Sequence, residues 1–368
     1  MTTQQSEDPE VARLRRIALW VLVAAFAFAS LQVLTLLKLQ AAGADFSCFW
    51  AGAKTALQAP GRLYDFGYVT QLQGWPLGPE KLRPYIYPPS ALLFFIPFTL
   101  APYWIDYALW TGVSAVIFLW AGLRARAPWW MMLLPPVAFE IYCGQVTLLV
   151  GGLIVAGLSY QKTRPIVAGV LYGLAAAVKP QIAVLLPLAL IADRRWRGLV
   201  AASVTGCALA LVSAAICGVG VWWDWILALG RFQQVIFNDP SLVEDTVTPY
   251  GALQSVGANG AWAFLIAPAV LFWVWRTFRR TDDLADRSIA IFAGALFLSP
   301  YAMNYEAALL APAVAIYLAR TKDPRWHGYA LAAVLYVAMP FVGVAKIVAV
   351  ACLPVLRLWR PASARPAL

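Results

Sequence analysis

The sequence has little charge, one histidine and no cysteine motif, and each shortage excludes a class of protein. Only 12% of its 368 residues are charged while 62% are hydrophobic, a balance that a soluble domain of this length does not have. The five cysteines lack the spacing of a metal site. The histidine, His327, lies in a polar stretch beside Asp323 and Arg325. A zinc-dependent mechanism is therefore disfavoured.

Nucleotide-binding signatures are also missing. The sequence has no glycine-rich phosphate loop, no Walker motif and no Ser-His-Asp arrangement. A nucleotide-sugar donor and an ATP-driven engine are disfavoured for this reason. The net charge of +10 could attract nucleic acid, but in a chain this apolar the basic residues mark cytoplasmic loops. We expect no nucleic-acid partner.

What the sequence does contain is a series of apolar runs, mostly of roughly 13 to 22 residues. Runs of this length without strict alternation predict membrane helices rather than barrel strands. The expected fold is all-α, a single polytopic transmembrane domain over residues 1–368 with about 12 membrane helices. About 22 apolar residues begin at Ile17, longer than the ~7–15 of a signal-peptide core. We therefore expect an uncleaved first helix and a cytoplasmic tail, residues 1–16.

Lys and Arg side chains gather in clusters between the apolar runs. Twenty of the 28 belong to seven such clusters. If all seven face the cytoplasm, the positive-inside rule fixes the orientation of a multi-pass protein of the plasma (inner) membrane. The clusters fall at 13–16, 124–126, 162–164, 194–197, 276–287, 320–325 and 357–365.

This orientation places two long segments on the periplasmic face, residues 41–103 and 218–258. Only one crossing, at 109–123, fits between the first segment and the cytoplasmic Arg124. The Pro-rich stretch 87–102 is then expected to form a short re-entrant or interfacial hairpin. The outer face also holds most of the acids, while the inner loops are short. We therefore expect the functional site on the outer face.

Asp45 follows the first apolar run directly, in the sequence "AAGADFSCFWAGAK". One interpretation is an exposed carboxylate that flanks a helix end. The other is a general base, partly buried by the aromatic residues Phe46, Phe49 and Trp50 so that its basicity rises. The residues alone leave these two interpretations about equal.

Lys179 lies within an apolar stretch of about 27 residues, where a lysine is costly and usually functional. A compact cation at the outer interface suits a lipid phosphate. The alternative is that Lys179 reaches water along the interface or pairs with an acid.

Five segments in order carry a resemblance to a known family. They are "DFSCFWAGAKTAL" with "LYD", "YIYPPSALLFFIPFTLAP", "GQVTLLVGGL", "AGVLYGLAAAVKPQIAVLLPLAL" and "LSPYAMNYEAALLAP". Together they resemble glycosyltransferase family 87, polyprenyl-phosphate-mannose-dependent mannosyltransferases of the GT-C superfamily. The match extends from about residue 45 to 312. It implies a GT-C type membrane fold with a long first periplasmic loop.

The resemblance also implies roles for particular residues. Asp45 matches the acid of the first outer loop that activates the acceptor hydroxyl, with Trp50 among the aromatic residues beside it. Lys179 would lie by the donor phosphate, and Gln145 and Tyr87 would line the same pocket.

Two further pairs match the family less closely. Tyr305 and Glu306 occupy a substrate-binding position where the family usually has Tyr-Asp, and the histidine that some members carry nearby is missing. Tyr64 and Asp65 match a loop motif that is either structural or catalytic.

The function implied is transfer of a hexose, with mannose favoured, from a polyprenyl-phosphate donor to a lipid or glycan acceptor at the periplasmic face, with inversion. No cofactor is expected, and a divalent metal is not favoured because no tight acidic pair lies near Asp45. The alternative is a transporter or lipid flippase with Asp45, Lys179 and Glu306 along its pathway. A non-catalytic membrane scaffold is the third reading, and it predicts no dependence on Asp45.

Overall fold

A computed structural model describes residues 42–74 and 82–320, together with scattered positions between 12 and 34. Within these residues the chain is all-α, and the only bridge between extended segments joins Thr246 to Met303. This agrees with the expected fold class. The expected crossings at 328–341 and 343–356, and most of the first helix, lie outside the described residues.

Three helices of the described part are long and apolar enough to cross a membrane: α5 (Tyr103–Arg124), α11 (Trp196–Cys217) and the helix over Gly260–Arg280. The expected crossing at 109–123 falls within α5. Only 6% of the apolar window of α11 is buried inside the protein, so its surface suits contact with lipid. The other apolar helices are shorter, at 10–17 residues. The expected count of about 12 crossings is therefore not established.

Short helices pack between the long ones through small residues. α7 (Thr147–Tyr160) is buried along nearly its whole length and contacts α5 and α8 (Pro165–Val178). α8 in turn packs against α11, where a Cβ added at Gly169 would collide with the backbone carbonyl of Gly198. Helices without large side chains at the contact approach closely, as membrane helix pairs do.

The two segments expected on the outer face are called here the first and second outer segments. The described residues of the first, 42–74 and 82–102, fold into short helices on an aromatic core. The stretch expected as a hairpin, 87–102, forms three helical turns, and Phe95 stacks on Phe49 at 4.6 Å and meets Trp110 at 5.0 Å between ring centroids. The elements of this segment are α2 (Phe46–Gln58), η1 (Pro60–Arg62), α3 (Phe66–Leu72), η2 (Pro89–Ala91), α4 (Leu92–Phe95) and η3 (Ile96–Thr99).

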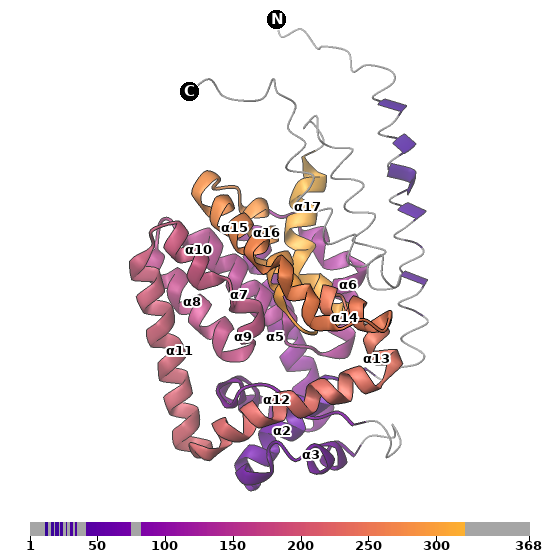
Figure 1. Ribbon diagram of the computed structural model, residues 1–368, viewed down its shortest axis with the longest axis vertical. Helices are drawn as coiled ribbons and strands as arrows, with labels where there is room; N and C mark the ends of the chain where they lie inside the picture. Colours follow the sequence, from indigo (N-terminus) through magenta and orange to yellow (C-terminus); the bar gives the residue numbers. More distant parts are fainter. Residues whose placement is uncertain are drawn as a thin grey trace, which may run out of the picture.

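The second outer segment is helical and lies against the first. Trp225 of α12 donates its indole N–H to the Ile86 carbonyl at 3.0 Å, and Arg231 of α12 donates to the Tyr64 carbonyl at 3.3 Å. Figure 1 shows α12 passing beside α2 and α3. The elements are α12 (Gly220–Asn238), α13 (Pro240–Glu244) and α14 (Pro249–Ser255).

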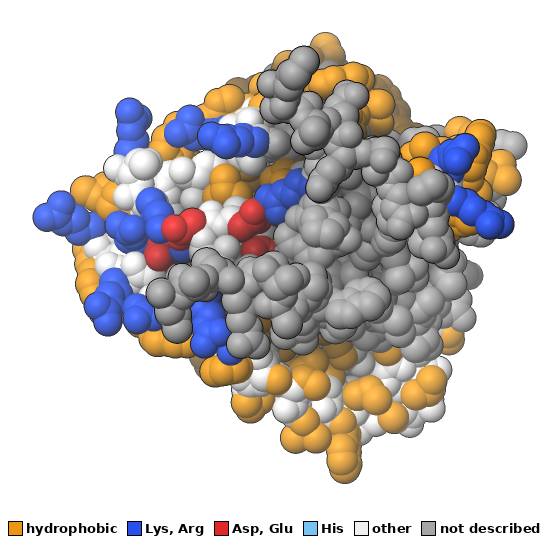
Figure 2. All heavy atoms as spheres, turned by 90° about the horizontal axis from the view of Figure 1, so that it is seen from above, with side chains coloured by type: hydrophobic (Ala, Val, Ile, Leu, Met, Phe, Trp, Pro, Cys, Tyr) orange, Lys and Arg blue, Asp and Glu red, His pale blue; other side chains and the backbone are white. Residues whose placement is uncertain are grey.

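Several basic clusters meet at the opposite end of the molecule. The buried Arg287 pairs with Asp193 and Asp282, and Lys162 also pairs with Asp282. Figure 2, which looks onto this end, shows Lys and Arg side chains gathered there. The remaining described elements are η4 (Trp129–Leu133), α6 (Pro135–Cys143), α9 (Pro180–Ala183), α10 (Leu186–Ala192), η5 (Gly260–Ile266), α15 (Ala267–Arg280), α16 (Leu284–Leu298), η6 (Asn304–Leu310) and α17 (Ala311–Ala319).

Candidate active site

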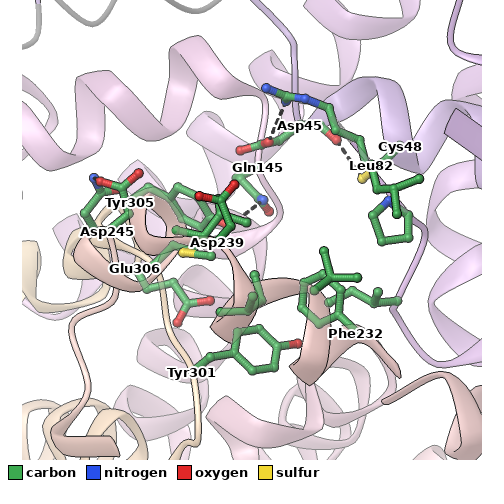
Figure 3. Close-up of a pocket in the computed structure, with 18 of the residues that line it drawn as sticks. Asp45, Cys48, Leu82, Gln145, Phe232, Asp239, Asp245, Tyr301, Tyr305 and Glu306 are labelled. Atoms are coloured by element: carbon green, nitrogen blue, oxygen red, sulfur yellow. Dashed lines mark hydrogen bonds and ion pairs between the residues drawn. The ribbon is translucent and has the colours of Figure 1, made fainter. Parts of the chain in front are cut away.

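A cavity of about 670 Å³ lies between the two outer segments, a volume typical of a small-molecule site. Its wall is formed by the start of α2, the extended residues 82–87, the break between α8 and α9, the end of α12, and residues 301–306. Figure 3 shows acidic side chains from several of these elements around one space.

The structure brings six of the seven sequence-predicted site residues to this cavity. Lying far apart in the chain, they converge because α2, the α6–α7 turn, the α8–α9 break and η6 meet at this end of the helices. The six are Asp45, Tyr87, Gln145, Lys179, Tyr305 and Glu306.

Trp50 does not line the cavity. It lies on the side of α2 that faces Tyr103, with 5.5 Å between ring centroids, and the Lys54 ammonium is 3.6 Å from its ring centroid. Phe46 and Phe49 are fully buried in the core. These three aromatic residues therefore do not line the cavity, because α2 turns them away and presents Cys48 to the cavity instead.

Asp45 stands at the N-terminus of α2 but does not cap it: no backbone N–H of the helix donates to its carboxylate. Its backbone N–H donates to the Cys143 carbonyl at 3.1 Å, which fixes its position. The side chain is 19% exposed and forms an ion pair with Arg83 at 3.2 Å. The exposed-carboxylate interpretation is thus contradicted.

The electrostatic surroundings of Asp45 favour a base. Burial raises the pKa of its carboxyl above the ordinary value, and Arg83, Gln145 and Lys179 offset part of this increase. A carboxylate with a raised pKa accepts a proton more readily. The site therefore holds a partly dry carboxylate that pairs with Arg83 and does not cap a helix.

A chain of hydrogen bonds crosses the cavity beside Asp45. The Tyr87 hydroxyl donates to Gln145 Oε1 at 3.1 Å, and Gln145 Nε2 donates to the Tyr305 hydroxyl at 2.9 Å. Gly144, with φ of 71°, ends α6 in the left-handed region and so turns Gln145 toward the site. The Tyr305 hydroxyl accepts from Gln145 and retains its own proton for donation.

Lys179 occupies the break between α8 and α9, where Pro180 prevents the first helix from continuing. Its ammonium forms an ion pair with Glu306, and the two side chains are 3% and 4% exposed. The rings of Tyr87 and Tyr305 flank it at 5.8 and 6.0 Å to their centroids. The alternative in which Lys179 pairs with an acid is the arrangement that the structure shows.

The sequence reasoning missed Arg83, Asp239, Asp245 and Asn304, which also line the cavity. Asn304 binds Asp245 by a side-chain hydrogen bond of 3.2 Å and a backbone hydrogen bond of 2.9 Å. Charged and amide residues in outer loops are common, so nothing in the sequence distinguished these four. Only their position in the cavity wall distinguishes them from other loop residues.

A buried carboxyl, Glu140, was also missed as part of this region. Its Oε1 accepts the Thr147 backbone N–H at 2.7 Å, while its Oε2 has no hydrogen-bond partner among the described residues. Glu140 lies near enough to Lys179 and Glu306 to interact with both electrostatically. Glu140 at the end of α6 therefore adds a second buried carboxyl to the surroundings of Lys179.

Tyr64 and Asp65 lie outside the cavity. The Tyr64 hydroxyl donates to the Tyr87 carbonyl at 2.7 Å, and Asp65 caps α3 by accepting the Tyr68 backbone N–H at 3.0 Å. Of the two readings of this motif, the contacts fit the structural one. Among the described residues, no group of three or more His, Cys, Asp or Glu side chains could hold a metal ion.

Comparisons with known proteins show the family of the chain. The family model described as glycosyltransferase family 87 matches residues 85–300, more than half of the chain. A curated relative from Mycolicibacterium smegmatis (strain ATCC 700084 / mc(2)155) is 27% identical over 343 residues, covering 84% of this chain and 78% of its own. Its name is polyprenol-phosphate-mannose-dependent alpha-(1-2)-phosphatidylinositol pentamannoside mannosyltransferase. No solved structure matches the chain.

Proposed function

The chain belongs to glycosyltransferase family 87, and from this membership we propose that it transfers a hexose from a polyprenyl-phosphate donor to a lipid or glycan acceptor, with mannose favoured as the sugar. The chain is a mannosyltransferase-like enzyme by its family and its relative. The relative's name specifies polyprenol-phosphate-mannose and phosphatidylinositol pentamannoside, which supports a lipid-linked donor and a glycolipid acceptor here.

One observation carries the proposal: the Asp45 carboxylate lies in a cavity whose wall also carries positive charge. A displacement at a sugar carbon requires a base for the acceptor hydroxyl and positive charge near the leaving phosphate. Because the leaving group is already a phosphate, positioning and electrostatics supply what the reaction needs, without a nucleotide site.

We assign the step as follows. The acceptor oxygen attacks C1 of the sugar from the face opposite the phosphate, and its proton passes to the Asp45 carboxylate. The C1–O bond to the phosphate breaks, and the phosphate leaves with the electron pair, so the configuration at C1 inverts. We expect Gln145 and the Tyr305 hydroxyl to bind sugar hydroxyls, because both lie in the cavity wall with Asp45.

The site is proposed to face the periplasm from the plasma (inner) membrane. The basic residues Lys162, Arg195, Arg287 and Arg320 meet in ion pairs at the end of the helices opposite the cavity. Positive charge at one end of a membrane protein marks the cytoplasmic side, and this supports an outward-facing cavity.

Sugar transfer by purified protein tests the proposal. The protein in liposomes receives labelled polyprenyl-phosphate mannose with phosphatidylinositol mannosides or other glycolipids as acceptors, beside the Asp45→Asn variant. We expect transfer by the native chain and almost none by the variant. Transfer that survives the substitution removes Asp45 as the base. Lipid flux without sugar transfer favours the transporter or flippase alternative. If neither sugar transfer nor lipid flux is observed, the non-catalytic scaffold is the interpretation that is left.

A further inference from the structure

Arg83 is the basic side chain of the cavity that a ligand can reach. Among the described residues, only Arg83 and Lys179 bring a positive charge to the cavity wall. Lys179 is 3% exposed and held by Glu306, whereas Arg83 is 20% exposed. A phosphate that enters the cavity therefore meets the Arg83 guanidinium without having to break a fully buried ion pair.

Hydrogen bonds to both the backbone N–H and the backbone carbonyl hold Arg83 in position. Its N–H donates to Thr70 Oγ1 at 3.0 Å, and its carbonyl accepts Gln73 Nε2 at 2.6 Å. Gln73 also accepts the Ser47 hydroxyl at 2.8 Å, and both side chains are buried. Ser47 follows Asp45 by two residues. The end of α3 thus fixes Arg83 and Asp45 relative to each other.

The Tyr64–Asp65 motif supports the same arrangement. Asp65 caps the start of α3, the helix that contains Thr70 and ends just before Gln73. Tyr64 holds the backbone of Tyr87, at the far end of the extended residues that begin beside Arg83. The motif therefore has a positioning role, because it holds residues 83–87 at both ends, through α3 at Arg83 and through Tyr64 at Tyr87.

We propose that Arg83 binds the phosphate of the donor and exchanges its pairing with Asp45 for the phosphate as the sugar is transferred. This inference rests on the proposed function and adds a phosphate-binding residue to it. Arginine suits this role because its planar guanidinium offers five N–H donors and can bind a carboxylate and a phosphate together.

The charges balance around this one side chain. Before transfer, the donor phosphodiester and the Asp45 carboxylate each carry one negative charge. During transfer the acceptor proton neutralises Asp45, and the C1–O electron pair adds one negative charge to the departing phosphate. The negative charge that Arg83 loses at Asp45 therefore reappears on the leaving group. A cation placed between the two stabilises charge where it develops.

Direct binding of a short-chain polyprenyl phosphate, without sugar or acceptor, tests the inference. The comparison uses detergent-purified native protein, Arg83→Gln, Asp45→Asn and the double variant. We expect Arg83→Gln to weaken binding about tenfold, the loss of one charge-assisted contact. Asp45→Asn should tighten binding by about fivefold to tenfold because it frees Arg83 from competition, and this gain should vanish in the double variant.

Two further variants keep the test decisive. Lys54→Gln removes a positive charge from α2, outside the cavity, and should leave binding unchanged. Arg83→Lys keeps the charge but not the two-pronged geometry, so an intermediate affinity is expected. If Arg83→Gln does not fold, Asp45→Asn and Arg83→Lys still decide the matter, since both leave a cation at position 83. Trp fluorescence melting curves identify any variant that fails to fold.

The outcomes separate this inference from the proposed function. Sugar transfer by the native chain with phosphate binding that is indifferent to Arg83 and Asp45 overturns the role of Arg83 alone. The expected binding pattern without any transfer supports the phosphate site and refutes the transferase. The inference is also overturned if Asp45→Asn weakens phosphate binding, because a carboxylate that competes for Arg83 must oppose the phosphate.

Discussion

The buried pair of Lys179 and Glu306 yields a sharp prediction. Each side chain is at most 4% exposed, so neither charge can turn to water when its partner is lost. Glu306→Gln leaves an unpaired ammonium in the protein interior, and such a change costs about 3–5 kcal/mol. Lys179→Met leaves a carboxyl that can take up a proton, so we expect a smaller loss of stability. The double variant Lys179→Met with Glu306→Leu should recover most of the native stability.

Unfolding in detergent, followed by Trp fluorescence, gives the order of stability. Lys162→Gln is the matched control, because Lys162 pairs with Asp282 at an exposed site, where its side chain is 45% exposed. A surface pair contributes about 0–1 kcal/mol, so this variant should melt close to the native protein. If Glu306→Gln melts as late as Lys162→Gln, the pair does not carry the cost of buried charge and the reasoning fails.

The same variants decide whether Lys179 binds the donor phosphate, as the family resemblance implied. A double variant that is as stable as the native chain and still transfers sugar assigns the pair a purely structural role. A stable double variant with a raised KM for donor and unchanged acceptor KM assigns Lys179 to the phosphate. The buried pair and the accessible Arg83 predict the first result.

Four other predictions concern the site and its surroundings. Asp45→Asn should lower the transfer rate by about 100-fold or more, since it removes the general base. In the native enzyme the transfer rate should fall as the pH drops through the raised pKa of Asp45, because its carboxylate is the active form. Arg83→Gln should move this fall to higher pH, since it removes a positive charge that lowers the pKa of Asp45. A rate that does not change with pH would contradict both expectations. Asp65→Asn should retain activity because Asn caps a helix as well as Asp, whereas Asp65→Ala should lose about 1 kcal/mol of stability. Loss of sugar transfer in Asp65→Asn would instead indicate that this carboxylate is catalytic. Chelation of divalent metals with EDTA should leave transfer unchanged, and a loss restored by one metal would refute metal independence.

The sequence was enough to predict a membrane protein because that prediction depends on composition and on the lengths of apolar runs, not on particular contacts. Apolar residues in long runs have to be kept away from water, by lipid or by protein, and clustered arginines resist translocation wherever they occur. The gathering of Lys162, Arg195 and Arg287 at one end agrees with this. The same reasoning could not set the number of crossings, because helices as short as α7 are buried by protein as readily as by lipid.

The contacts of Lys179 and Trp50 could not be predicted from their neighbours in the sequence. A lysine in an apolar run must have a partner, but the sequence does not say whether that partner is a ligand or a distant acid such as Glu306. Trp50 adjoins Asp45 in sequence, yet the register of α2 turns it toward Tyr103. Direction around a helix changes by about 100° per residue, so closeness in sequence is a poor guide to a shared face.

The sequence by itself determined a membrane protein of a recognisable family, with Asp45 as the residue to test, because composition and motif order survive without coordinates. Only the tertiary structure decided which charges meet. Arg83 lies in a polar stretch where a charge costs little, so nothing in the chain singled it out. Its pairing with Asp45 depends on Ser47, Thr70 and Gln73, contacts that exist only once α2 and α3 have packed together.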